Sequence, residues 1–216
     1  MNKIHQSHLN LSFHEPASLL KGVENEMQRV SQEQLFNNPK YQKLKESWCA
    51  SMFGLGIQKH VSPCEVAINN SNNRLDVDFY LKTPSGIWEF QLVEIQEPGR
   101  RRGLLYRQLS TLRRTLIPYE PERGRTEGPG WIANGVERKK AKNYAGKQSL
   151  NLLVYVNFTA HNLQYEALVR ALSTYSDSFP SLWLVSSLTF CSIFSNSGIR
   201  EVPGWAVIRE ISTYWE

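Results

Sequence analysis

Residues 74–81 read Arg-Leu-Asp-Val-Asp-Phe-Tyr-Leu, residues 82–86 read Lys-Thr-Pro-Ser-Gly, and residues 87–96 read Ile-Trp-Glu-Phe-Gln-Leu-Val-Glu-Ile-Gln. The first run alternates with period 2, which puts every second side chain on the same face of a strand. One face carries Val77, Phe79 and Leu81, and the other carries Asp76, Asp78 and Tyr80. The proline and glycine between the runs favour a turn. The sequence therefore predicts a hairpin folded at Pro84–Ser85, with Asp78 opposite about Gln91.

This hairpin gathers acidic side chains. Asp76 and Asp78 come near Glu94, and Glu94 and Gln96 share one strand face about 6.6 Å apart. Clustered carboxylates repel one another, so at least one of them should have a raised pKa when no cation lies among them. Mg²⁺ takes carboxylate oxygens and water, so the pattern predicts a Mg²⁺ site. The alternative is a solvated strand edge on which Glu94 pairs with an arginine.

The spacing from Asp78 to Glu94, with Leu92-Val93-Glu94-Ile95-Gln96 around the glutamate, resembles the core motif of the PD-(D/E)XK nuclease superfamily. The resemblance covers about 20 of the 216 residues. It implies an α/β fold, a restriction-endonuclease-like mixed β-sheet flanked by helices. Gln96 stands where the family motif has lysine. Some active restriction enzymes are similar to this chain in having Glu-x-Gln.

The resemblance also implies roles for individual residues. Asp78 and Glu94 would ligate Mg²⁺ or Mn²⁺, with Asp76 as a further ligand or a helper outside the coordination sphere, and the carbonyl of Ile95 would complete that sphere. Gln96 would orient a water or a phosphate oxygen, because its amide both donates and accepts. Glu46, on a helix before the first strand, would hold a second metal or a bound water. The other candidates for this helix position are Glu24, Glu26 and Glu33.

Composition and length indicate one globular domain over residues 1–216, with 41% hydrophobic and 11% aromatic residues. No apolar run near 18 residues and no signal-peptide pattern is present, so we expect a soluble protein that contacts no membrane. Cys49, Cys64 and Cys191 are odd in number and widely spaced, which favours a reducing cytoplasm. His5, His8 and His14 are either a metal-binding group or incidental residues of an N-terminal tail.

Positive charge is concentrated in residues 100–147, which hold 13 Lys and Arg against four Glu, a net charge of +9. The remainder carries 12 basic and 16 acidic residues, a net charge of −4. The segment begins four residues after Gln96, so it should emerge beside the acidic cluster and bind phosphates. The expected contacts are Arg100, Arg101, Arg102, Arg107, Arg113, Arg114, Lys139 and Lys140. The alternative is a solvated, solubilising face.

The rest of the chain shows helix and strand patterns in sequence. An N-terminal helical region covers 16–53, with helices at 16–36 and 39–53 and Gly54 as a stop. A first strand is expected at 64–69, an amphipathic helix at 104–116, and a basic loop or insertion at 117–147, where Trp131 and Tyr144 either anchor the loop or stack on bases. Strands at 150–158 and 181–186 flank a helix at 163–172, and one or two strands follow in 188–216.

Three classes of function remain open at this point. The first is a Mg²⁺-dependent endonuclease that hydrolyses phosphodiester bonds, with double-stranded DNA as the expected partner and a homodimer as one assembly. The second is a catalytically inactive module of the same fold that binds nucleic acid or takes part in an assembly. The third is a basic-surfaced protein-interaction domain. A phosphate-binding glycine loop, an HExxH motif and a metal-spaced cysteine pair are absent from the sequence.

Overall fold

A computed structural model describes residues 11–70, 76–99, 121–142, 149–158 and 163–209. The N-terminal part contains α1 (Pro16–Gln28), α2 (Gln32–Asn37), the short 3-10 helix η1 (Pro39–Tyr41) and α3 (Gln42–Gln58). Three strands follow: β1 (Glu65–Ile68), β2 (Phe79–Thr83) and β3 (Gly86–Gln96). The remaining elements are α5 (Pro121–Ala141), β4 (Leu150–Asn157), α6 (Tyr165–Leu172), η4 (Ser173–Tyr175), β5 (Ser181–Val185), β6 (Thr189–Ser195) and β7 (Ala206–Val207).

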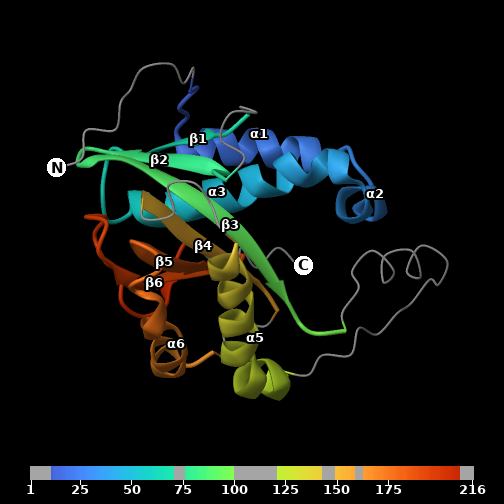
Figure 1. Cartoon of the computed structure of the whole chain (residues 1–216). Helices are drawn as coiled ribbons and strands as arrows, with labels where there is room; N and C mark the ends of the chain where they lie inside the picture. The colour runs from blue at the N-terminus through green and yellow to red at the C-terminus, as the bar shows by residue number, and fades with distance from the viewer. Residues whose placement is uncertain (1–10, 71–75, 100–120, 143–148, 159–162, 210–216) are drawn as a thin grey trace.

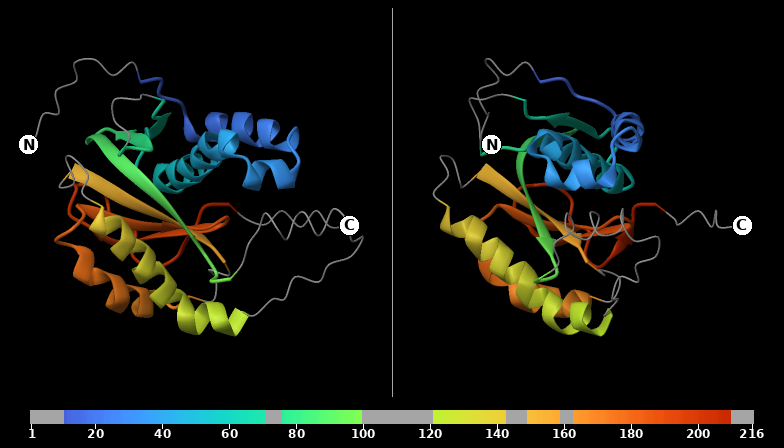
Figure 2. Two further views of the ribbon diagram at one scale, coloured as in Figure 1. Left: turned by 45° about the vertical axis from the view of Figure 1, so that its right-hand side comes forward. Right: turned by 90° about the vertical axis from the view of Figure 1, so that its right-hand side faces the viewer.

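The strands form one mixed sheet in the order β1-β2-β3-β4-β5-β6-β7. β1, β2 and β3 are antiparallel, β3, β4 and β5 are parallel, and β6 and β7 continue antiparallel. The helices α1, α2 and α3 lie on one side of the sheet, and α5 and α6 lie on the other (Figures 1 and 2). This confirms the mixed α/β class and the predicted sheet flanked by helices.

Each face of the sheet has its own core. On the α3 face, the ring of Phe53 packs among four aromatic rings of the sheet, those of Phe79, Phe90, Trp183 and Phe190. On the opposite face, Ile132 and Val136 of α5 and Leu168 and Leu172 of α6 cover apolar side chains of β3, β4 and β5. Burial on both faces explains the continuous apolar runs of β4 and β5, since parallel central strands have no solvent face.

The predicted hairpin is confirmed. Phe79 pairs with Phe90 and Thr83 with Gly86, and the backbone N–H of Asp78 donates to the carbonyl of Phe90 at 2.9 Å. Gly86 closes the turn with φ of +153°, a value that L side chains rarely adopt. Tyr80, which the alternation assigned to the face of Asp76 and Asp78, is buried at 2% exposure. Both faces of β2 are covered, because a second cluster that includes Val77 and Ala67 encloses Tyr80.

Two predictions about the N-terminal helices are wrong in detail. The expected helix at 16–36 is two helices, and Ser31 starts the second by accepting the N–H of Gln34 at 3.2 Å. Gly54 does not end α3, which continues to Gln58. A Cβ on Gly54 would lie 2.6 Å from Cγ2 of Val66, so the glycine allows α3 to approach β1 closely.

The expectation of a loop over 117–147 is wrong for residues 121–141, which form α5 with Pro129 inside it. Two of the glycines that suggested a loop, Gly128 and Gly135, lie at close packing contacts. A Cβ on Gly135 would meet the side chain of Ile95, so the glycine lets α5 approach β3 closely. Trp131 is a packing anchor, as one alternative predicted, and meets the ring of Phe158 edge to face at 5.1 Å. The predicted helix at 104–116 and Tyr144 lie outside the described residues.

The other elements follow the sequence closely. β1, β4, α6 and β5 match their predicted segments to within two residues at each end, and β6 and β7 are the strands expected in 188–216. His14 forms a backbone bridge to Val66 beside β1, whereas His5 and His8 lie outside the described residues. Among the described helices, none combines the length and apolar character needed to span a membrane.

Candidate functional site

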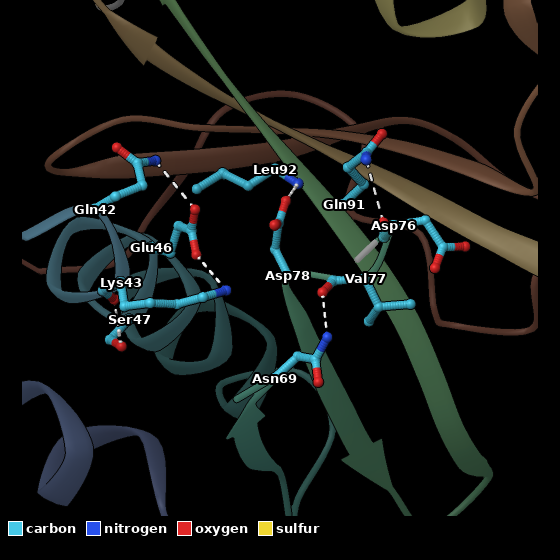
Figure 3. Close-up of polar contacts among 10 residues, drawn as sticks. All are labelled: Gln42, Lys43, Glu46, Ser47, Asn69, Asp76, Val77, Asp78, Gln91 and Leu92. Carbon is cyan, nitrogen blue, oxygen red and sulfur yellow. Dashed lines mark hydrogen bonds and ion pairs between the residues drawn. The ribbon is translucent and has the colours of Figure 1, made fainter. Parts of the chain in front are cut away.

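The candidate site lies where β3 extends beyond the start of β2. β2 begins at Phe79, opposite Phe90, so the next free N–H on this edge of β3 belongs to Leu92. The carboxylate of Asp78 accepts that N–H, with 2.7 Å between Oδ2 and the Leu92 nitrogen (Figure 3). The side chain of Asp78 is therefore fixed against β3 at Leu92. Leu92 lies two residues before Glu94 on that strand.

Glu46 of α3 lies on the same side as Asp78 (Figure 3). It is buried at 8% exposure, accepts a hydrogen bond from Nε2 of Gln42 at 3.0 Å, and forms an ion pair with Nζ of Lys43 at 2.8 Å. Of the four helix glutamates considered from the sequence, Glu46 is the one whose charge acts on Asp78. Glu24 instead pairs with Arg209 at 2.9 Å.

Burial raises the pKa of Asp78 above its ordinary value. The hydrogen bond from Leu92 acts in the opposite direction, and the negative charge of Glu46 adds to the rise. The sequence predicted a raised pKa for one carboxylate of the cluster, and its direction is confirmed at Asp78. The predicted cause is wrong, because burial outweighs repulsion and the repelling charge belongs to Glu46.

The charge of Lys139, on α5, lowers the pKa of Asp78. In α5, Ile132, Gly135, Val136 and Lys139 follow the i, i+3, i+4, i+7 spacing of a single helix face, and the first three are buried against the sheet. Burial lowers the pKa of Lys139, and the charge of Asp78 partly offsets that effect. The charges of Glu46 on α3 and Lys139 on α5 thus shift the pKa of Asp78 in opposite directions.

Glu94 and Gln96 share a face of β3, as predicted, and they are directly bonded. Nε2 of Gln96 donates to Oε1 of Glu94 at 2.9 Å, and Nδ2 of Asn157 donates to the same oxygen. Asn157 is opposite Gln96 in the parallel pair of β3 and β4. Sequence reasoning missed Asn157. The feature that could have indicated it is a polar residue at the end of the apolar run 150–156.

Other predicted site residues lie elsewhere. The carboxylate of Asp76 points away from Asp78 and Glu46 (Figure 3), while its backbone carbonyl accepts from Nε2 of Gln91 at 3.1 Å. The side chain of Ile95 is buried under α5. Lys140 pairs with Glu137 at 3.8 Å and lies 5.6 Å from the ring centre of Tyr175. The predicted phosphate contacts that fall outside the described residues are Arg100, Arg101, Arg102, Arg107, Arg113 and Arg114.

Metal-binding capacity depends on which oxygen donors converge. Within the described ranges, no group of three or more His, Cys, Asp or Glu side chains lies close enough to hold a metal ion. Mg²⁺ does not require such a group, since it commonly keeps several waters and takes one or two carboxylates together with substrate phosphates. Asp78 and Glu94 are donors of this chemistry.

Comparisons of the chain with protein-family models, with curated proteins and with solved structures find no match.

The raised pKa of Asp78 has a consequence for stability. Between the unfolded value of about 3.9 and the higher folded value, the native state binds more protons than the unfolded chain, so stability falls as pH rises through this window. Asp78→Asn keeps an oxygen that accepts the Leu92 N–H and removes the charge. Without metal, we expect its free energy of unfolding to match wild type below the window and to exceed it above, as measured by urea denaturation from pH 3.5 to 7.

The control for this comparison is Asp177→Asn, which changes an exposed aspartate in the segment before β5. The difference in free energy of unfolding between Asp177→Asn and the wild type should not rise with pH through this window. If Asp78→Asn were less stable than wild type at pH 7, the buried charge would be stabilised by a partner and the cost of burial would not dominate.

Proposed function

We propose that this chain is a metal-dependent endonuclease of the PD-(D/E)XK type, with a restriction-endonuclease-like fold, that hydrolyses phosphodiester bonds of double-stranded DNA. The observation that carries the proposal is the hydrogen bond that holds the Asp78 carboxylate at Leu92, two residues before Glu94 on β3. Buried Glu46 lies beside Asp78 (Figure 3). The strand order, three antiparallel strands followed by two parallel ones, supports the same fold assignment.

In this proposal Asp78, Glu94 and the carbonyl of Ile95 hold Mg²⁺ or Mn²⁺. When bound, the metal supplies a Lewis acid and a water of lowered pKa. Gln96 orients that water or a phosphate oxygen, and its hydrogen bond to Glu94 fixes its position. Lys139 contributes a positive charge that acts on Asp78, and such a charge suits a phosphate group. The arginines of residues 100–114 bind the DNA backbone in a manner that weakens with salt.

A specific observation favours a second candidate, a catalytically inactive module of the same fold that binds nucleic acid. Oε1 of Glu94 already accepts two amide donors, and Gln96 carries no charge. Such a site can persist without a metal, because hydrogen bonds to a carboxylate compensate for its charge. Both candidate functions include DNA binding, and only the first includes DNA cleavage.

Incubation of the purified protein with supercoiled plasmid tests the proposal. We expect nicked and then linear plasmid with Mg²⁺ or Mn²⁺, and intact plasmid with a chelator. Ca²⁺ should permit binding without cleavage, because it accepts looser geometry than Mg²⁺. Binding by gel shift with no cleavage under any of these metals would favour the inactive module. Absence of both binding and cleavage would rule out both candidates.

A further inference from the structure

A small aromatic pocket lies beside the candidate site, between the layer of α1, α2 and α3 and the strands β3 and β4. Its volume is about 210 Å³. Trp48 and Tyr155 meet edge to face, with ring centres 5.6 Å apart. The apolar lining includes Met27, Leu35, Phe36, Trp48, Leu92 and Tyr155. These side chains come from α1, α2 and α3 on one side and from β3 and β4 on the other.

Two carboxylates of the candidate site line the same pocket. Glu46 contributes from α3 and Glu94 from β3, and Leu92, whose N–H is bonded to Asp78, belongs to the same lining. Carboxylates accept hydrogen bonds, so a ligand that fits here presents N–H donors at one edge. Lys45 is also a lining residue and is partly exposed, which suits a phosphate attached to such a ligand.

The size of the pocket limits its occupant. Pockets for drug-sized ligands occupy about 300 Å³ or more, so this one accepts a smaller body. Its walls favour a planar ring system, because aromatic side chains bind flat rings by stacking. A single nucleobase meets each of these conditions. Adenine, cytosine and guanine each have a flat face and an exocyclic amino group that donates to a carboxylate.

We propose that this pocket receives one unpaired nucleobase of the DNA strand bound at Asp78 and Glu94, an inference that rests on the proposed function and names its substrate class. The base stacks on the aromatic walls, and its amino edge donates to Glu46 and Glu94. A base inside a duplex cannot reach such a pocket until it leaves the stack, and the cost of leaving is least where it is already unpaired. The preferred substrate is therefore DNA with a single-stranded, mismatched or bulged base.

A fluorescent base analogue tests this directly. 2-Aminopurine is placed opposite an abasic site in one duplex and opposite thymine in a second, and the free nucleoside is the third probe. Binding is measured in chelator, so that it is independent of cleavage. We expect the wild type to bind the unpaired duplex roughly tenfold more tightly than the paired duplex, with a change in 2-aminopurine fluorescence, since stacking on aromatic side chains favours binding to that extent.

Phe36→Leu and Trp48→Leu keep apolar bulk and remove one aromatic wall each, so each should lose most of that preference. Trp131→Leu is the matched control, because Trp131 packs against Phe158 in the core on the opposite face of the sheet. It should retain the full preference. Glu94→Gln leaves the aromatic walls intact and should weaken binding of the unpaired base. This variant still tests the pocket if Phe36→Leu or Trp48→Leu does not fold cooperatively.

Equal affinity for the two duplexes, or a preference that survives in Phe36→Leu, Trp48→Leu and Glu94→Gln alike, would overturn the pocket assignment. Binding of the free nucleoside as tightly as the unpaired duplex would overturn capture from a strand. The proposed function fails separately. Metal-dependent cleavage without a 2-aminopurine response would contradict only the pocket assignment. A response without cleavage would contradict only the nuclease proposal.

Discussion

Asp78→Ala should lower Mg²⁺-dependent plasmid cleavage at least about 100-fold, because loss of groups that merely orient a metal ligand already costs 10- to 100-fold. Asp78→Asn should be equally inactive. The asparagine keeps an acceptor for the Leu92 N–H at the sheet edge but lacks the charge that a hard cation requires. Cleavage is measured as the initial rate of nicking, and DNA binding by gel shift should be largely unchanged in both variants.

Asp177→Ala provides the control, since it removes an exposed aspartate away from β3. It should cleave at the wild-type rate. Should Asp78→Asn cleave as fast as the wild type, the Asp78 carboxylate would not be a metal ligand, and its role would be confined to joining the start of β2 to β3.

Phe53→Ala should cost about 3–5 kcal/mol in the free energy of unfolding, the range for large-to-small changes at a buried phenylalanine. Phe53 is fully buried, and its ring lies 5.2 Å from that of Phe90 and 5.3 Å from that of Trp183. Removing it leaves a cavity between α3 and the sheet. For a chain of this size the melting temperature should fall by about 10 °C.

Phe13→Ala is the matched control, because Phe13 is only half-buried and packs at the margin of a smaller cluster. Its cost should be less than half that of Phe53→Ala in the same urea titration. Equal costs at the two positions would mean that the aromatic cluster around Phe53 is not the core that holds α3 against the sheet.

The sequence allowed the hairpin and the central strands to be predicted because their signals are local. Alternation, turn residues and apolar runs locate β2, β3, β4 and β5 without reference to the rest of the chain. The helix α5 could not be predicted in this way. Its glycines and Pro129 disfavour a helix in isolation, whereas the burial of Ile132 and Val136 against the sheet stabilises it in the folded protein. Such packing depends on which face of the sheet the segment covers, and the local sequence of the segment does not specify that face.

The candidate site was predictable only in part for a related reason. The hairpin register follows from the turn, so Asp78 could be placed beside β3 from the sequence. The charges that act on Asp78 belong to Glu46 on α3 and Lys139 on α5, and sequence spacing does not show how close either helix comes to Asp78. The same limit explains the error at Asp76. A strand pattern assigns it to the face of Asp78, but β2 begins only at Phe79.

The central claim, that Asp78 and Glu94 hold one divalent metal, is tested most directly by titrating Mn²⁺ into the protein and counting bound ions by electron paramagnetic resonance. The wild type should bind one Mn²⁺ that Mg²⁺ displaces, and the double variant Asp78→Asn, Glu94→Gln should lose it. The double variant Glu65→Gln, Asp177→Asn makes the same change in net charge away from the site and should bind as the wild type does. Unchanged Mn²⁺ binding in the Asp78→Asn, Glu94→Gln protein, or no displaceable ion in the wild type, would contradict the claim.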